Sequence, residues 1–221
     1  MGYVPGTANV NAAVIMLVIL MWSWTPAAAS PPLRLLVLGD SLTAGYGLNA
    51  EDGFTARLQA ALTAEGRDVV VLNAGVSGDT TAGGRARIGW ALGDKPDAVI
   101  VELGANDGLR GLDPKATFDN LDAVITEIRR AGLPVLLTGM LAPPNLGRDY
   151  AGEFNAVFPR LAEKHDVLFY PFFLAGVAAR PELNQDDGIH PNPKGVAAVV
   201  ARILPYVLDL VARVKTKAGA S

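Results

Sequence analysis

A serine, an aspartate and a histidine in this sequence have the types and surroundings needed for acyl transfer. Ser41 lies in the glycine-rich segment GDSLTAGYG, and Asp187 and His190 lie three residues apart in DDGIHPN. A serine hydroxyl is a poor nucleophile until a neighbouring base takes its proton. A histidine serves as that base when its ring is held in the correct tautomer. Asp187 is the candidate for holding it, because the loop containing Gly188 can present both side chains.

The candidate base is chosen from only two histidines. His165 lies at the charged end of an expected helix, where a surface position is expected, so His190 is the one plausible base. The charged pair Arg85 and Arg87 is likewise expected to be solvated, because paired charges on helices usually are. Asp186 is a rival to Asp187 as the carboxylate that orients the ring. The G-x-S-x-G elbow of α/β-hydrolases is absent around Ser41, which predicts the same chemistry on a different scaffold.

The elements that must position these residues follow an alternating pattern. Short apolar runs bounded by turn residues alternate with helical patterns from residue 33 to the C-terminus. Near-continuous apolarity is typical of strands that are covered on both faces of a parallel sheet. The expected strands are residues 33–38, 68–72, 98–103, 134–138 and 167–170.

Amphipathic helices are expected between these strands. One begins after Asp113 and Pro114 and ends at Gly132, because its apolar residues repeat at helical spacing between a start and a stop signal. The other expected helices are residues 54–65, 152–164 and 193–214. Five strands with helices between them predict a three-layer α/β/α sandwich around a five-stranded parallel sheet.

Polar, glycine-bearing loops follow the first three expected strands, at the sheet edge where such folds bind ligands. These loops contain Ser41, Gly78 and Asn106, and a fourth polar segment, residues 186–192, directly precedes the last helix. Asp40 and Asp107 also lie at strand ends. We expect these two carboxylates to hold loop backbone by hydrogen bonds rather than to touch a substrate.

Four segments in this order, LGDSLTAGYG, NAGVSGDTTAGG, VELGANDGLRG and QDDGIHPNPKG, resemble the SGNH (GDSL) hydrolase superfamily. The residues of these segments are similar to those of its bacterial acyl-CoA thioesterase, lysophospholipase and arylesterase branch. The resemblance covers nearly the whole chain after residue 29 and implies the flavodoxin-like SGNH hydrolase fold. It implies Ser41 as nucleophile, Asp187 and His190 as the rest of a triad, and Gly78 and Asn106 as oxyanion-hole donors. Every one of these positions matches the family pattern.

The implied oxyanion hole agrees with the chemistry of its residues. Gly78 can offer a backbone N–H without a side chain in the way, Asn106 can offer its amide NH₂, and the Ser41 N–H makes a third donor.

By the same resemblance, the loop with Leu109 closes over a bound acyl chain. The segment with Leu141 and Pro143 supplies an apolar wall, so we expect a groove for a fatty-acyl or aryl group.

The leading hypothesis is therefore a serine hydrolase that cleaves acyl esters or thioesters, including lysophospholipids, through an acyl-Ser41 intermediate, with no cofactor and no metal. One alternative keeps this chemistry and changes the substrate to acetylated carbohydrate, which an open, polar groove would favour. A non-catalytic nucleotide- or flavin-binding module is the third reading. It is disfavoured because no phosphate-binding glycine motif follows the first strand and because Asp40 would repel an anion there.

The composition is that of one soluble domain with a small-molecule partner. The chain has 221 residues, of which 50% are hydrophobic, none is cysteine, and 19 Lys plus Arg stand against 22 Asp plus Glu. A net charge of −3 offers no basic surface for nucleic acid, and a chain without cysteine has no disulfide, thiolate metal site or cysteine nucleophile. The oligomeric state is not predicted.

The N-terminal segment resembles a secretory signal. Residues 12–24 are apolar except for Ser23, and Ala27 and Ala29 supply small residues for a signal peptidase. We therefore expect a signal peptide over residues 1–29, a catalytic domain over 30–221 and export to the periplasm or medium, with no stable membrane span after cleavage. No charged residue precedes Arg34, which departs from the usual pattern, and an uncleaved anchor is the alternative.

Overall fold

Five parallel strands form one sheet in the computed structural model, which describes residues 1–2 and 31–218. The strand order is β2-β1-β3-β4-β5, the order of flavodoxin-like sheets. The strands are β1 (Leu33–Gly39), β2 (Val69–Gly75), β3 (Ala98–Glu102), β4 (Val135–Thr138) and β5 (Leu168–Tyr170). The expected five-stranded parallel sheet is confirmed, and all its carboxyl ends lie at one edge.

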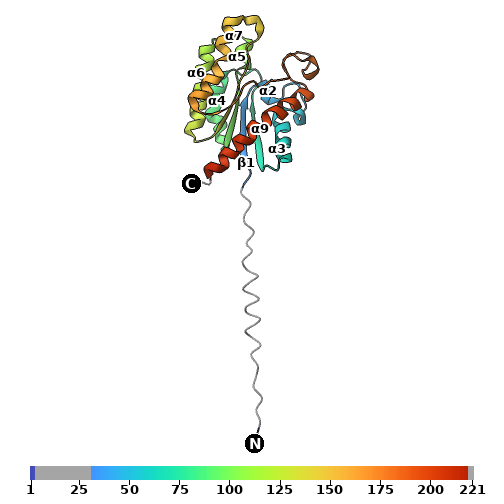
Figure 1. Ribbon diagram of the computed structural model, residues 1–221, viewed down its shortest axis with the longest axis vertical. Helices are drawn as coiled ribbons and strands as arrows, with labels where there is room; N and C mark the ends of the chain where they lie inside the picture. The colour runs from blue at the N-terminus through green and yellow to red at the C-terminus, as the bar shows by residue number, and fades with distance from the viewer. Residues whose placement is uncertain (3–30, 219–221) are drawn as a thin grey trace. The chain divides into compact units, whose positions relative to one another are not determined.

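Helices cover both faces of this sheet (Figure 1). On one face α3 (Phe54–Ala64) contacts α9 (Pro193–Ala218), and on the other α6 (Pro114–Arg130) contacts both α4 (Thr81–Ala91) and α8 (Val157–His165). Three shorter helices lie in the connections: α2 (Ser41–Ala44), α5 (Ala105–Leu109) and α7 (Arg148–Asn155). The expected three-layer sandwich is therefore confirmed.

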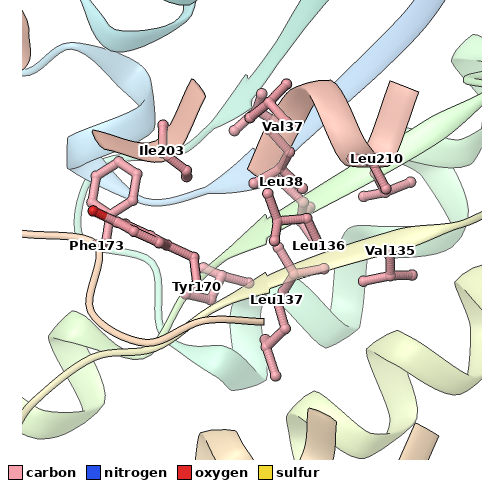
Figure 2. Packing of buried hydrophobic residues seen from close by; sticks show 14 of the residues in the cluster. Val37, Leu38, Val135, Leu136, Leu137, Tyr170, Phe173, Ile203 and Leu210 are labelled. Atoms are coloured by element: carbon pink, nitrogen blue, oxygen red, sulfur yellow. The ribbon is translucent and has the colours of Figure 1, made fainter. Parts of the chain in front are cut away.

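The core lies between the sheet and its helices. Register places Val37 of β1 and Leu136 of β4 on the same face, because both align with the same residue of β3. Figure 2 shows Ile203 and Leu210 of α9 over this face, while Leu137 points to the opposite side. All five side chains are fully buried. Such burial stabilises by about 1.5–3 kcal/mol for each large aliphatic side chain, which makes the sheet a rigid base for its edge loops.

β2 continues three residues beyond its expected end. Asn73 and Gly75 favour turns, but the backbone from 73 to 75 pairs with Val37, Leu38 and Gly39 of β1. This pairing outweighs the weak strand propensity of those residues. Gly75 also allows α2 to lie against the end of β2, since a Cβ there would come within 2.3 Å of the Ala44 backbone nitrogen.

The helix expected at residues 152–164 is two helices, α7 and α8, and α7 begins earlier, at Arg148. The break follows from Pro159, which has no N–H to donate to the carbonyl of Asn155 four residues before it. Helix α9 also differs from expectation, since it continues to Ala218.

Helix α4 is absent from the sequence expectation. Its buried residues are Thr81, Gly84, Ile88 and Ala91, so the side that faces the sheet consists mostly of small residues. A Cβ at Gly84 would lie 2.3 Å from a methyl carbon of Leu103. Close packing rather than a large apolar stripe therefore holds α4, and the usual periodicity signal is weak.

The expected signal segment lies outside the described residues. The chain divides into Met1–Pro31 and Pro32–Ser221, and the fold above is that of the second unit alone. Within the described part of the chain, one helical stretch, Pro193–Val214 of α9, is long and apolar enough to cross a membrane. Its buried side packs against the sheet (Figure 2), which accounts for its apolar character.

Candidate active site

Ser41 begins α2 directly after β1. Asp40 caps this short helix, because its Oδ1 accepts the Leu42 N–H at 3.0 Å, and the chain leaves the helix at Gly45 with φ of 81°. Asp40, and not Ser41, therefore fills the capping position. The Ser41 hydroxyl is left to face the loops at the carboxyl edge of the sheet.

His190 lies between Ser41 and Asp187. Its Nε2 is 2.9 Å from Ser41 Oγ, and its Nδ1 is 2.6 Å from Asp187 Oδ2. The other oxygen of Asp187 accepts the backbone N–H groups of Ile189 and His190, each at 3.0 Å. Asp186, the rival carboxylate, is exposed, and the partner of the ring is Asp187. The three side chains form one continuous hydrogen-bonded series.

The Asp187 carboxylate is held in its ionised form. Partial burial raises its pKa, but the hydrogen bonds from the backbone and ring of His190 and from the Ile189 N–H outweigh burial and lower the pKa to about 2. An anion beside Nδ1 favours the tautomer in which Nδ1 carries the proton. Nε2 is then the ring atom that can accept a proton from Ser41.

Gln185 ties the histidine loop to the serine segment at a second point. Its Nε2 donates to the carbonyls of Tyr46 at 2.8 Å and Pro191 at 3.0 Å, and its backbone N–H donates to the His190 carbonyl at 2.7 Å. The Tyr46 ring lies 4.7 Å from the His190 ring, centroid to centroid. A Cβ at Gly47 would clash with the Gln185 side chain. Sequence reasoning missed Gln185 because no local pattern marks a contact across 139 residues.

Gly78 and Asn106 line the same groove as Ser41. Gly78 has φ of +81°, a left-handed conformation that glycine adopts without strain. The Asn106 Nδ2 donates to Asp40 Oδ2 at 3.3 Å, which leaves its second N–H for another acceptor. The structure therefore brings together the five residues that the sequence singled out: Ser41, Gly78, Asn106, Asp187 and His190.

A buried pair of carboxyl groups lies beneath the nucleophile segment. Burial raises the pKa of Asp40 to about 6, although bonds from Leu42 and Asn106 act against it. Burial and the nearby charge of Asp40 raise the pKa of Glu102, at the end of β3, well above its usual value. Glu102 Oε2 accepts the Thr43 hydroxyl at 2.7 Å. Both acids are fully buried, so protons on them remove the cost of placing charge there.

Asp107 holds loop backbone, as expected. Its Oδ2 accepts the Thr81 N–H at 2.9 Å, and its Oδ1 lies 2.5 Å from the Thr81 hydroxyl and 3.3 Å from the Thr117 hydroxyl. Asp107 thereby joins α5, which also carries Asn106, to the start of α4 and to α6.

A groove of about 550 Å³ is lined by Ser41 and His190. Its walls include the three residues expected to contact a substrate, Leu109, Leu141 and Pro143. Further walls come from Met140, Ala142, Pro144, Phe172, Leu174 and Ile189. The lining is mostly apolar, which is the character expected for a groove that holds an acyl chain or an aryl ring.

Two sequence interpretations are wrong. His165 is not on the surface: its side chain is 13% exposed, and its Nε2 lies 2.6 Å from Asp122 of α6. Arg87, interpreted with Arg85 as a solvated charge, is 19% exposed and bonds to three segments of the site edge. Arg85 is exposed, as expected. The misreading arose because charges on helices usually point to water, and nothing local distinguishes these two arginines.

Among residues 1–2 and 31–218 there is no group of three or more metal-binding side chains. Groups that line the groove with the capacity to accept or donate a proton or hydrogen bond include the Ser41 hydroxyl, the His190 imidazole and the Asn106 amide. A serine, histidine and aspartate in series at the rim of an apolar groove is the arrangement of serine hydrolases.

Comparison with known proteins shows which family of serine hydrolases this chain resembles. The model of the GDSL-like Lipase/Acylhydrolase family matches residues 37–198. The chain is 40% identical over 199 residues to the arylesterase of Vibrio mimicus, covering 90% of this chain and 96% of that protein. It is also 40% identical over 177 residues to thioesterase 1/protease 1/lysophospholipase L1 of Escherichia coli strain K12, covering 80% and 82%.

Among solved structures, the crystal structure of AlinE4, an SGNH-hydrolase family esterase, matches with a TM-score of 0.70 at 46% identity. The match covers 81% of this chain and 97% of that one. The chain belongs to the GDSL-like lipase/acylhydrolase family, and the family resemblance seen in the sequence is confirmed.

Proposed function

We propose that this protein is a serine hydrolase that cleaves acyl esters and thioesters through a covalent acyl-Ser41 intermediate. The observation that carries the proposal is the unbroken series from Asp187 through His190 to Ser41, with distances of 2.6 and 2.9 Å, at the rim of an apolar groove. The arylesterase and thioesterase names of its relatives support the same reaction class.

In the acylation step, His190 Nε2 takes the proton of the Ser41 hydroxyl while Oγ forms a bond to the substrate carbonyl carbon. The carbonyl oxygen becomes an oxyanion, which accepts hydrogen bonds from the Ser41 and Gly78 N–H groups and the Asn106 amide. The imidazolium then gives its proton to the departing alcohol or thiol as the bond to the acyl carbon breaks. Asp187 stabilises the imidazolium and stays ionised.

In the deacylation step, water replaces the departed group. His190 takes a proton from water as the oxygen attacks the acyl carbon, and it returns that proton to Ser41 Oγ when the acyl-enzyme bond breaks. The products are a carboxylic acid and the free hydroxyl of Ser41. Every step is accounted for by side chains of this chain and one water.

The groove supports an apolar acyl or aryl substrate. Leu109, Leu141 and Pro143 offer apolar contact in the groove that Ser41 also lines, and each buried methylene of a fatty chain gains about 0.8 kcal/mol. The alternative of an acetylated carbohydrate called for an open, polar groove, and the largely apolar lining disfavours it. We therefore propose medium or long acyl esters, acyl thioesters and aryl esters as substrates.

Replacement of the nucleophile tests the mechanism. Ser41→Ala should abolish hydrolysis of p-nitrophenyl esters and acyl-CoA while the circular dichroism spectrum and melting temperature stay close to those of the wild type. Undiminished turnover by this variant would refute the mechanism. A series of kcat/KM values over acyl length, with acetyl-xylan as a further substrate, separates the lipid substrates from the carbohydrate alternative.

We also propose that residues 1–29 direct export and are removed after Ala29, on the apolar run and small residues of that segment. N-terminal sequencing of the protein from the periplasm or medium should begin near Ser30. An intact Met1 on the soluble form in the cytoplasm would contradict this, and an intact Met1 in the membrane fraction would favour the uncleaved anchor.

A further inference from the structure

The Arg87 guanidinium joins three segments that meet at the edge of the active site. Its Nε donates to Asp79 Oδ2 at 2.7 Å, its Nη1 to the Ala74 carbonyl at 2.8 Å, and its Nη2 to the Gly39 carbonyl at 2.8 Å. The Arg87 and Asp79 side chains are only 19% and 14% exposed. Sheltered contacts of this kind are stronger than those of surface ion pairs.

Two of the three acceptors of Arg87 lie within two residues of a group that the proposed mechanism needs. Gly39 ends β1 two residues before Ser41, Ala74 lies near the end of β2, and Asp79 directly follows Gly78. The Gly39 carbonyl also accepts the Val76 N–H at 3.1 Å. Arg87 therefore fixes the distance between the nucleophile segment and the loop that carries the Gly78 donor.

The surroundings are shaped for this contact. A Cβ at Gly83 would come within 1.7 Å of Asp79 Oδ1, so glycine there leaves the space that the carboxylate occupies. A guanidinium carries five N–H groups in a planar fork, and it can bond three acceptors in different directions at once. A lysine ammonium carries three donors on one nitrogen and cannot span the same three acceptors.

We infer that Arg87, together with Asp79, is a positioning residue for the oxyanion hole. It does not line the groove. It holds Ser41 and Gly78 at the separation that the transition state requires. This inference rests on the proposed function, since it concerns the geometry of the same site. A misplacement of about 1 Å caused by a residue away from the chemistry can lower the rate by about 10²-fold.

The test compares Arg87→Gln and Arg87→Lys with Arg85→Gln. Arg85 lies on the same helix, is exposed, and donates from its Nη1 to Asn120 Oδ1 at 3.3 Å. For p-nitrophenyl octanoate well below the melting temperature, we expect kcat of Arg87→Gln to fall by about 10²-fold. We expect KM of Arg87→Gln to change by less than about threefold, because only transition-state contacts are lost. Arg87→Lys should lose at least about tenfold in kcat. The control, Arg85→Gln, should keep kcat within about twofold of the wild type.

A pair of inhibitors separates positioning from general loosening. An octyl trifluoromethyl ketone adds to Ser41 and forms an oxyanion, whereas octanoate occupies the groove as a product. The affinity for the ketone should fall in the Arg87 variants by the same factor as kcat/KM, while the affinity for octanoate should not change. Asp79→Asn removes the negative partner of the Arg87–Asp79 ion pair and should show the same pattern. This variant replaces Arg87→Gln in the test if Arg87→Gln fails to fold.

The inference is overturned if Arg87→Lys and Asp79→Asn keep wild-type kcat, or if both inhibitors weaken equally. Either result is distinct from failure of the proposed function. If the proposed function failed, the wild type would not hydrolyse the ester, or Ser41→Ala would retain activity.

Discussion

At the scale of single residues, the proposed mechanism depends on carboxylates that act on the reacting groups through hydrogen bonds. Asp187 orients His190 through a 2.6 Å contact and receives two backbone N–H groups. Asp187→Asn should lower kcat by about 10⁴-fold, because the amide favours the wrong imidazole tautomer. Asp186→Asn is the matched control and should stay close to wild type in the same p-nitrophenyl ester assay. A larger loss in Asp186→Asn would transfer the role to that residue.

Asp40 holds the Asn106 amide, the side-chain donor that we propose for the oxyanion hole. Its two oxygens accept the Leu42 N–H and the Asn106 Nδ2, and Asp40→Asn places an NH₂ group against one of these donors. We expect kcat to fall by about 10²-fold, comparable with Asn106→Ala. Because both changes damage the same contact, the double variant should lose little more than either single variant. Losses that multiply in the double variant would show that the two residues act independently.

At the scale of elements, the proposed catalytic residues lie at strand ends and in the loops that follow them, and Leu109 at the end of α5 forms part of the groove wall. Leu109 is 48% exposed at the groove, and the neighbouring Arg110 Nη2 donates to the Gly78 carbonyl at 2.9 Å. Leu109→Ala should raise KM for octanoyl esters several-fold and leave acetyl esters nearly unchanged, because only a long chain reaches this side chain. Equal effects on both substrates would argue against contact between Leu109 and the acyl chain.

The close approach of α2 to β2 gives a prediction on stability. A methyl group at Gly75 would lie 2.3 Å from the Ala44 backbone nitrogen. Gly75→Ala must therefore displace α2, which costs about 1–3 kcal/mol and moves Ser41 with it. Thermal unfolding should show a lower melting temperature and the ester assay a lower kcat. Gly93→Ala is the control, since Gly93, like Gly75, lies outside the left-handed region and has open space around it.

Elements were predictable from sequence where a strong apolar pattern sets them. The five strands and α6 follow from continuous apolar runs and helical spacing, and the motif loops follow from their place after those strands. The contacts of Arg87 and Gln185 were not predictable, because each joins segments that only the fold brings together. α4 was missed because small residues form its buried side. The division at Asn155 could have been predicted from Pro159.

At the scale of the whole molecule, the buried acids make stability depend on pH. The native pKa of Asp40 is about 6 against an ordinary value of 3.8, so the native state keeps a proton that the unfolded chain loses between these values. This contribution to stability is present at low pH and is lost as the pH rises through about 6. Glu102 acts in the same direction. Asp187 acts in the opposite direction, and its contribution is lost as the pH falls from 3.8 toward about 2.

The prediction concerns Asp40→Asn, which cannot ionise. The melting temperature of the variant minus that of the wild type should be higher at pH 8 than at pH 5 by at least about 2 °C. Differential scanning calorimetry at the two pH values measures it. A difference that is independent of pH would show that Asp40 does not hold a proton in the native state.

The contact between Ser41 and His190 spans 149 positions of the chain. During synthesis the Ser41 hydroxyl is therefore made well before the imidazole that contacts it. A nascent chain that ends before residue 190 lacks this base, and by the proposed mechanism its Ser41 should not be acylated.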